Sequence, residues 1–194
     1  MHTTDEVCSY KRETVEALYT STLRADFELL RRAGLRNVTA YGGALRDADI
    51  GCSVQAYTYC AQLPEGSALG ALCLATRGML QQFGADTQFK VNSLPGDHAL
   101  HFAFNHKGRQ LDVIMMGNQP PCIERLACHA PYGLRGIAMN ETGVIVASSA
   151  YLQDKCLKTL TINSDIAPAD RHYARNQAMT LKQRAAYADF KIVG

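Results

Sequence analysis

The residues best suited to binding a ligand lie in YGGALRDADI, residues 41–50. A short β-rich run, NVTAY, is followed by Gly42 and Gly43, and the next residues can form a brief helix. Glycines at such a junction expose backbone N–H groups beside a helix N-terminus, where the helix dipole favours an anion. Arg46 could add a bidentate contact to a phosphate. Gly42, Gly43 and Arg46 therefore predict a phosphate site, although a tight turn alone would also explain the glycine pair.

Three carboxylates could hold a divalent cation next to that site. Asp47 and Asp49 form a D-x-D pair, and Asp112 lies in the run QLDVIMM. Mg²⁺ takes oxygen ligands and prefers charged ones. On a strand the pair would point to one side, but on a helix the two side chains diverge by roughly 200°. Because residues 44–50 are expected to be helical, we expect that Asp47 and Asp49 cannot share one ion with Asp112.

Cysteine and histidine side chains form no other recognisable centre. Cys122, Cys128 and His129 could ligate a soft metal with His98 or His101, but no spacing matches a structural zinc site. We therefore expect these cysteines to pack as small apolar residues. His98 and His101 fall on opposite sides of an alternating strand, so they cannot bind one ion together. A nucleophile–base pair of Cys128 with His129 is disfavoured, because sequence neighbours rarely face each other.

Hydrophobic periodicity and turn residues predict the elements that must position these side chains. Helices are expected at residues 4–33, 44–50, 67–83, 120–128, 148–155 and 167–187. Strands are expected at residues 37–41, 53–60, 87–92, 98–105, 110–116, 143–147 and 159–162, with a hairpin turn at NHKG, residues 105–108. No repeat or linker interrupts this order. Residues 1–194 are therefore expected to form one α+β domain with a long N-terminal helix and a basic C-terminal helix.

The composition excludes a strong general attraction to polyanions or lipid. The 194 residues are 47% hydrophobic and 20% charged, and the formal net charge is +2. No apolar run reaches the roughly 20 residues that span a bilayer, and no secretory apolar region follows Met1. The seven cysteines are scattered, without a C-x-x-C pair. These features predict a cytoplasmic protein with reduced thiols and no membrane segment.

Two groups of basic residues could contact a partner. Arg171, Arg175 and Lys182 share one side of the C-terminal helix and could bind nucleic-acid phosphates or an acidic protein. A solvated helix face is the simpler interpretation, because no aromatic residues interleave for base stacking. The second group lies on and just after the first helix, where Asp26 and Glu28 partly neutralise it; it comprises Arg24, Arg31, Arg32 and Arg36.

The order of these segments resembles a known family. Strand, Gly-Gly-x-x-Arg-Asp, second strand and a later acidic strand are arranged as in the nucleotidyltransferase head of poly(A) polymerases and CCA-adding enzymes. The closer resemblance is to the small stand-alone nucleotidyltransferase-like proteins of tailed bacteriophages. It is carried by GGALRD, QAYTYC, QLDVIMM, IERLACHAPYGLRGIAMNETGVIVAS and AYLQDKCLKTLTIN. The resemblance implies a small mixed sheet flanked by helices, and the host-cell cytoplasm as the location.

The resemblance also implies where catalytic residues would stand. Enzymes of that family hold two divalent metal ions between two strand aspartates and a third carboxylate, and the ions activate the attacking hydroxyl. The first two carboxylates fall at Ala56 and Thr58, whose side chains cannot replace them, and the third falls at Asp112. Arg46 becomes a phosphate contact. A downstream Phe-Asp-Phe of the family is Ala-Pro-Tyr here, residues 130–132.

Three functions follow from these observations. We expect a phage-type pseudo-nucleotidyltransferase that requires no cofactor and acts by binding, and thereby inhibiting, a host macromolecule. An alternative is an active enzyme that uses Mg²⁺ and a nucleoside triphosphate, with Asp47, Asp49 and Asp112, to modify nucleic acid or protein. A second alternative is a protein that binds a nucleotide at the predicted phosphate site without turnover.

Overall fold

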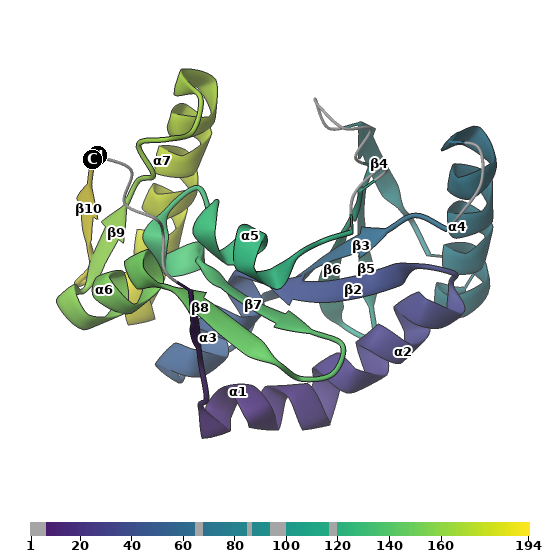
Figure 1. Ribbon diagram of the computed structural model, residues 1–194, viewed down its shortest axis with the longest axis horizontal. Coiled ribbons are helices and arrows are strands. Elements are labelled where there is room, and N and C mark those ends of the chain that lie inside the picture. The colour runs from purple at the N-terminus through teal and green to yellow at the C-terminus, as the bar shows by residue number, and fades with distance from the viewer. Residues whose placement is uncertain (1–6, 65–67, 85–86, 94–99, 117–119) are drawn as a thin grey trace.

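The computed structural model describes residues 7–64, 68–84, 87–93, 100–116 and 120–194 (Figure 1). Its centre is an eight-stranded mixed sheet with the strand order β1-β8-β7-β2-β3-β6-β5-β4. The β3–β6 pair is parallel, and the other neighbouring pairs are antiparallel. The strands are β1 Val7–Ser9, β2 Arg36–Tyr41, β3 Ala56–Gln62, β4 Lys90–Ser93, β5 Leu100–His106, β6 Arg109–Met116, β7 Ile137–Asn140 and β8 Ile145–Ser148.

Helices flank this sheet, and a small second sheet accompanies it. α1 (Glu13–Leu18), a π-helical turn (Tyr19–Leu23) and α2 (Arg24–Arg32) form one continuous helical segment. The other helices are α3 (Gly43–Ile50), α4 (Ala68–Phe83), α5 (Ile123–Cys128), α6 (Ser149–Leu157) and α7 (Pro168–Lys182). Strands β9 (Thr159–Thr161) and β10 (Lys191–Val193) pair in parallel near α6 and α7 (Figure 1). The mixed sheet flanked by helices confirms the predicted α+β class.

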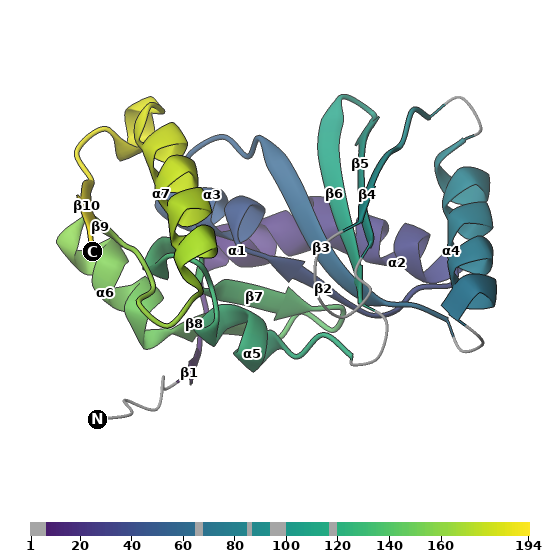
Figure 2. The same ribbon diagram turned by 90° about the horizontal axis from the view of Figure 1, so that it is seen from above.

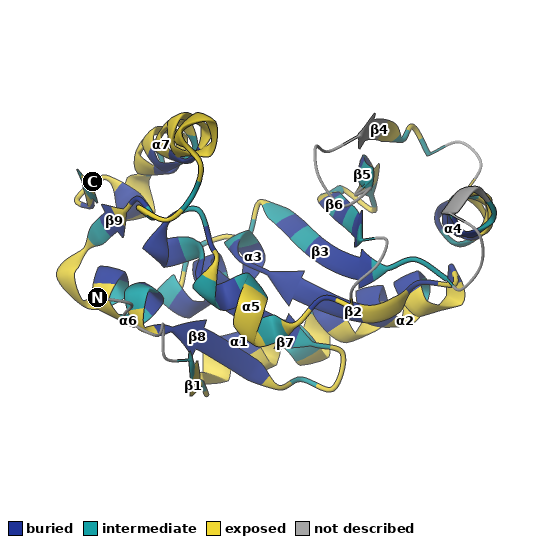
Figure 3. Ribbon diagram, turned by 45° about the horizontal axis from the view of Figure 1, so that its top comes forward, coloured by how far each residue is buried: buried dark blue, intermediate teal, exposed yellow. Residues whose placement is uncertain are grey.

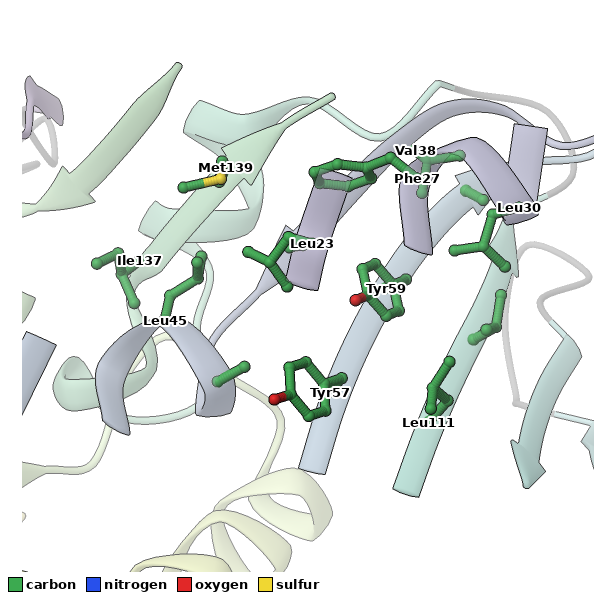
Figure 4. Packing of buried hydrophobic residues seen from close by; sticks show 14 of the residues in the cluster. Leu23, Phe27, Leu30, Val38, Leu45, Tyr57, Tyr59, Leu111, Ile137 and Met139 are labelled. Carbon is green, nitrogen blue, oxygen red and sulfur yellow. The ribbon is translucent and has the colours of Figure 1, made fainter. Parts of the chain in front are cut away.

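One face of the main sheet carries the larger hydrophobic core. Along β6, Leu111 and every second residue after it are buried while their neighbours are half-buried, as the period of a strand requires. Leu23 and Phe27 of the helical segment lie against this face, close to Tyr57 and Tyr59 of β3 (Figure 4). The segment is therefore held on the sheet by its apolar side.

A buried ion pair also fixes the helical segment to the sheet. Asp26 of α2 is fully buried, and Arg109 at the start of β6 donates to its two oxygens at 2.6 and 2.7 Å. The Tyr59 hydroxyl donates to the same carboxylate at 2.6 Å. The prediction that Asp26 neutralises arginines of its own helix is therefore wrong, because its charge is paired with a strand residue. Removing one partner from such a pair typically costs about 3–5 kcal/mol.

The opposite face of the sheet is only partly covered. α5 packs over β2, β7 and β8, where Tyr41, Cys60 and Ala138 belong to a second and smaller apolar cluster. Further along the same face, β3 and β6 present half-buried residues such as Thr58 and Asp112. Seen from above, β3 and β6 lie between α7 on one side and α4 on the other (Figure 2). This part of the sheet forms the floor of the site described below.

The N-terminal segment differs from its prediction. The helix expected over residues 4–33 is wrong at its start, because Val7–Ser9 form the edge strand β1 and the helical segment begins at Glu13. β1 pairs with β8, which lies far along the chain. Helical periodicity within the segment could not reveal a partner at that distance. The first residues of the predicted helix, 4–6, lie outside the described residues.

Two strands in the C-terminal half were not predicted. β7 is a central strand between β2 and β8, and β10 pairs with β9. The terminal helix, expected to reach residue 187, ends at Lys182, and a 3₁₀ turn follows at Ala185–Tyr187. α5 begins at Ile123, three residues later than expected from the Pro-Pro pair, because Cys122 is still extended (φ −105°, ψ 125°).

Two local predictions that bear on the site are confirmed. α3 begins at Gly43, directly after the strand that ends at Tyr41. The NHKG hairpin joins β5 and β6, and Lys107 and Gly108 have φ values of 51° and 75°. Positive φ at two central residues is typical of the type I′ turn, whose twist matches that of the flanking strands.

Candidate functional site

A cleft of about 760 Å³ lies between α7, the first turn of α3 and the uncovered face of the sheet. In Figure 3, α7 stands across from β3 with α3 between them. The charged residues of the cleft lining are three arginines, Arg46, Arg135 and Arg184. Its amides come from α7, from the segment after it and from the edges of β3 and β6; they are Gln55, Gln110, Asn176, Gln177 and Gln183.

The floor of the cleft contains the two positions at which the resemblance placed metal carboxylates. Ala56 and Thr58 of β3 line the cleft, and Thr58 is paired with Asp112 across the parallel β3–β6 ladder. Asp112 Oδ1 lies 2.9 Å from His101 Nε2, and its Oδ2 accepts from Gln110 at 3.3 Å. A methyl group and a neutral hydroxyl are poor substitutes for carboxylates as ligands of hard cations. His98, which was predicted to lie on the same strand as His101, lies outside the described residues.

Asp47 is 1% exposed and connects α3 to the segment that follows α7. Its Oδ1 accepts from Arg46 Nη2 at 2.7 Å and from the Tyr187 hydroxyl at 2.6 Å, while Oδ2 accepts from Arg184 Nη1 at 2.8 Å. Burial and the hydrogen bond to Asp47 raise the pKa of Tyr187, so its hydroxyl remains protonated and donates. We call Arg46, Asp47, Arg184 and Tyr187 the Asp47 clasp, because together they hold one wall of the cleft.

Asp49 is bonded to a different part of the fold. Its carboxylate accepts from the Tyr151 hydroxyl at 2.6 Å and from the Lys155 ammonium at 2.7 Å, both on α6. Within the described residues, no group of three or more His, Cys, Asp or Glu side chains could hold a metal ion. Asp47, Asp49 and Asp112 are therefore not brought together. The same finding applies to a soft-metal site of Cys122, Cys128 and His129 with His101.

Arg46 is enclosed by the protein rather than presented freely to the cleft. It is 5% exposed, its Nε and Nη2 donate to Asp47, and its Nη1 donates to the Tyr132 hydroxyl at 3.1 Å. Burial acts to lower the pKa of Arg46, but Tyr132 and Asp47 raise it above its ordinary value, so the charge is retained. The phosphate contact implied for Arg46 stays a prediction, and it would require a donor that is already hydrogen-bonded.

Arg135 is a cleft residue that sequence reasoning did not single out. It ends the 3₁₀ turn Gly133–Arg135, and its Nη1 donates to Gln177 Oε1 of α7 at 2.6 Å. Its guanidinium carbon lies 5.0 Å from the centre of the Tyr41 ring. The side chain runs across Gly42, which has φ +69°, and a Cβ added to Gly42 would lie 2.8 Å from Arg135 Cγ. Gly42 therefore serves both the backbone conformation and the placement of Arg135.

Close packing fixes the turn that carries Arg135. A Cβ at Gly133 would lie 2.5 Å from Asp154 Oδ2, and one at Gly136 would overlap the Ser148 hydroxyl. Asp154 is buried, and its Oδ2 accepts a backbone N–H of the turn at 3.0 Å. The signal available in the sequence was GLRG, residues 133–136, in which two glycines flank Leu134 and Arg135. The structure shows that other side chains approach both glycines closely.

Solved structures of CCA-adding enzymes share the fold of this chain over nearly its whole length. The Thermotoga maritima CCA-adding enzyme complexed with tRNA matches with a TM-score of 0.59 and 16% identity, over 97% of this chain and 43% of that enzyme. A CCA-adding enzyme in complex with CTP matches with a TM-score of 0.59 and 16% identity, over 97% of this chain and 44% of that enzyme. The Bacillus stearothermophilus CCA-adding enzyme in complex with CTP matches with a TM-score of 0.55 and 14% identity, over 94% of this chain and 42% of that enzyme. The chain has a nucleotidyltransferase-like fold.

The present chain spans less than half the length of those CCA-adding enzymes. No family model matches the sequence, and no curated protein matches it either. At 14–16% identity the likeness shows the nucleotidyltransferase-like fold alone. A fold alone does not assign a function, because one fold hosts many unrelated functions.

The cleft carries an excess of positive charge. Asp47 pairs with Arg46 and Arg184, so two guanidinium groups share one carboxylate. In the part of the chain that the structure describes, no carboxylate lies within ion-pair distance of Arg135. Burial acts to lower the pKa of Arg135, but Tyr41 and Tyr132 raise it above its ordinary value. A charged and unpaired guanidinium at a cleft is suited to receive an anion.

The basic residues predicted on the C-terminal helix lie on α7 and are exposed. Arg171 donates to the carbonyl oxygens of Ser164 and Ile166, and Arg175 donates to that of Gly194. Lys182 is exposed at the end of α7. Their role in partner binding stays a prediction. None of the helices in the described part of the chain combines the length and apolar character that a membrane crossing requires.

Proposed function

We propose that this chain is a nucleotidyltransferase-like protein that does not transfer nucleotides and acts by binding a partner. The floor of the cleft carries the proposal, since Ala56 and Thr58 stand there beside Asp112. Two-metal catalysis needs carboxylates that hold both ions. Asp112 Oδ1 is already engaged by His101 Nε2 at 2.9 Å, so one of its two oxygens has a protein partner.

The active-enzyme alternative would require Asp47 and Asp49 to take over the metal. Asp47 is bound within its clasp, and Asp49 is bound by Tyr151 and Lys155. Moving Asp47 toward Asp112 would leave the buried Arg46 and the half-buried Arg184 without their partner, and moving Asp49 would do the same to the half-buried Lys155. Breaking a fully buried pair costs about 3–5 kcal/mol, and partial exposure reduces that cost. The geometry therefore favours structural roles for both aspartates.

The partner we propose is a host macromolecule, for a protein encoded by a tailed phage and acting in the host cytoplasm. Six of the cysteines are free thiols, namely Cys8, Cys52, Cys60, Cys73, Cys122 and Cys156, which fits a reducing compartment. One CCA-adding enzyme with this fold was solved with tRNA, so RNA is the first macromolecule to test. Two surfaces could bind it, the cleft and the outer side of α7 with Arg171 and Lys182.

A transfer assay tests the loss of activity. The purified chain is incubated with each labelled nucleoside triphosphate, with Mg²⁺ or Mn²⁺, and with tRNA, an RNA oligonucleotide or host protein as acceptor. We expect no incorporation above that of a heat-inactivated sample. Incorporation that requires metal and disappears in Asp112→Ala, while the thermal midpoint of that variant is unchanged, would refute the proposal.

Affinity purification from host lysate tests the binding role. Wild type is compared with Arg135→Gln in the cleft and with the double variant Arg171→Gln/Lys182→Gln on α7. Arg135 is chosen over Arg46 because replacing Arg46 would also disrupt the buried clasp. We expect one macromolecule to be retained by wild type and lost from only one of the two variants. A partner that both variants retain equally would place the interface elsewhere on the surface.

A further inference from the structure

Arg135 differs from the other two arginines of the cleft in what its donors contact. Arg46 and Arg184 both bond to Asp47, and Arg184 Nη2 also donates to the Ser53 carbonyl oxygen at 3.0 Å. In the described part of the chain, the hydrogen-bond acceptor of Arg135 is Gln177 Oε1 at 2.6 Å. A guanidinium carries several N–H donors in a rigid fork, so most of the Arg135 fork is left for a ligand.

The surroundings of Arg135 favour an anion over a water shell alone. The residue is half-buried, and one side of its guanidinium is covered by the Tyr41 ring. A charge that is partly removed from water gains little from solvent and much from an opposite charge. The neighbouring clasp carries two arginines and one aspartate, so it adds positive charge and offers Arg135 no compensation.

The position of Arg135 is also fixed before any ligand binds. Gln177 of α7 accepts a hydrogen bond from its guanidinium, and the guanidinium packs against the Tyr41 ring. Gly42 has no Cβ and so leaves room for the aliphatic part of the arginine side chain. The turn below it is held by Asp154 through a backbone N–H. Its contact with Gly42 places the side chain beside the first turn of α3, whose N–H groups have no partner within the helix. Preorganisation of this kind reduces the entropy lost on binding.

We propose that Arg135 is the anchor for a phosphate group bound in this cleft without a metal ion. The inference deepens the proposed function, because it names the chemistry of the ligand for a cleft that does not catalyse transfer. The guanidinium fork compensates the negative charge of the phosphate, which divalent ions do in a two-metal site. The phosphate belongs either to a free nucleotide or to a polynucleotide, and both present the same group to the fork.

Binding is measured by calorimetry in EDTA and, separately, in Mg²⁺, with three probes. Tripolyphosphate tests the phosphate group alone, CTP tests a free nucleotide, and a single-stranded RNA oligonucleotide tests a polynucleotide. We expect at least one probe to bind in EDTA, and Arg135→Gln to weaken it about tenfold to a hundredfold, as for loss of a charge-assisted fork. Arg135→Lys should recover only part of the affinity, because an ammonium has no fork.

Arg77→Gln is the matched control, because it removes the same charge from an exposed position on α4, which does not line the cleft. Its affinity should stay within about twofold of wild type at moderate salt. Thermal midpoints within about 2 °C of wild type establish that each variant is folded. The proposal is overturned if no probe binds in EDTA, if binding requires Mg²⁺, or if Arg135→Gln weakens binding no more than Arg77→Gln. These outcomes are independent of the transfer assay, so failure of either proposal is recognised separately.

Discussion

Two substitutions should build a metal site on the cleft floor, if Ala56 and Thr58 stand where carboxylates of this fold would stand. The variant is Ala56→Asp/Thr58→Asp. Residues two apart on a strand point to the same face, and Thr58 is paired with Asp112 on the neighbouring strand. The variant therefore places two new carboxylates beside an existing one in a half-buried cleft.

The expected size of the effect follows from the spacing of the strands. Neighbouring strands lie about 4.8 Å apart, and two carboxylates at about 5.5 Å repel by roughly 3 kcal/mol at an effective dielectric constant of about 20. Screening at a partly exposed floor reduces the net loss to about 2 kcal/mol, or about 4–8 °C in the thermal midpoint for a chain of this size. A divalent ion at roughly 100 times its dissociation constant returns about 2.7 kcal/mol, or about 5–11 °C.

The assay is thermal unfolding followed by circular dichroism, in EDTA and in MnCl₂. The control variant is Ala56→Asn/Thr58→Asn, which adds the same bulk without charge. For wild type and for this control, the thermal midpoint in MnCl₂ should equal the midpoint of the same protein in EDTA. The Asp variant should melt lower in EDTA and rise in MnCl₂. If Mn²⁺ leaves the midpoint of the Asp variant unchanged, or raises that of wild type equally, the placement of Ala56 and Thr58 as vacant ligand positions is refuted.

Three further predictions concern the groups that shape the cleft. Asp47→Asn leaves the buried Arg46 and the half-buried Arg184 short of their shared carboxylate and should lower the free energy of unfolding by about 3–5 kcal/mol in urea titrations, whereas the exposed Asp189→Asn should change it by less than about 0.5 kcal/mol. Gly136→Ala forces a methyl group onto the Ser148 hydroxyl and should cost about 1–3 kcal/mol in the same titration; equal stability to wild type would contradict the packing described. Burial raises the pKa of Cys60 from 9.0 to about 12. The stability that this thiol contributes is therefore complete below pH 9.0 and is lost as the pH rises toward about 12. Cys60→Ala should reduce the decline of the urea midpoint with rising pH in this range. An unchanged decline would contradict the raised pKa of Cys60.

The parts of the fold that depend on nearest neighbours could be predicted from the sequence. α3 follows from a glycine pair and a helical run, and the turn at Lys107 and Gly108 follows from its two-residue geometry. β7 was missed because its four residues, IAMN, show no alternation between apolar and polar positions. Its identity as a strand comes from its pairing with β2 and β8, which lie on either side of it.

The sequence by itself determined that a glycine pair and Arg46 would stand at the start of a helix, which the structure confirms, but not that Arg135 would join them. That Ala56 and Thr58 stand in place of carboxylates was implied by the family resemblance. Only the tertiary structure decided how each charge is paired. Asp47 bonds to Arg184, which lies 137 positions away, and Arg135 reaches the cleft without a carboxylate partner among the described residues. Pairing between groups so distant depends on the path of the whole chain, because the energy of a charge is set by what surrounds it in space.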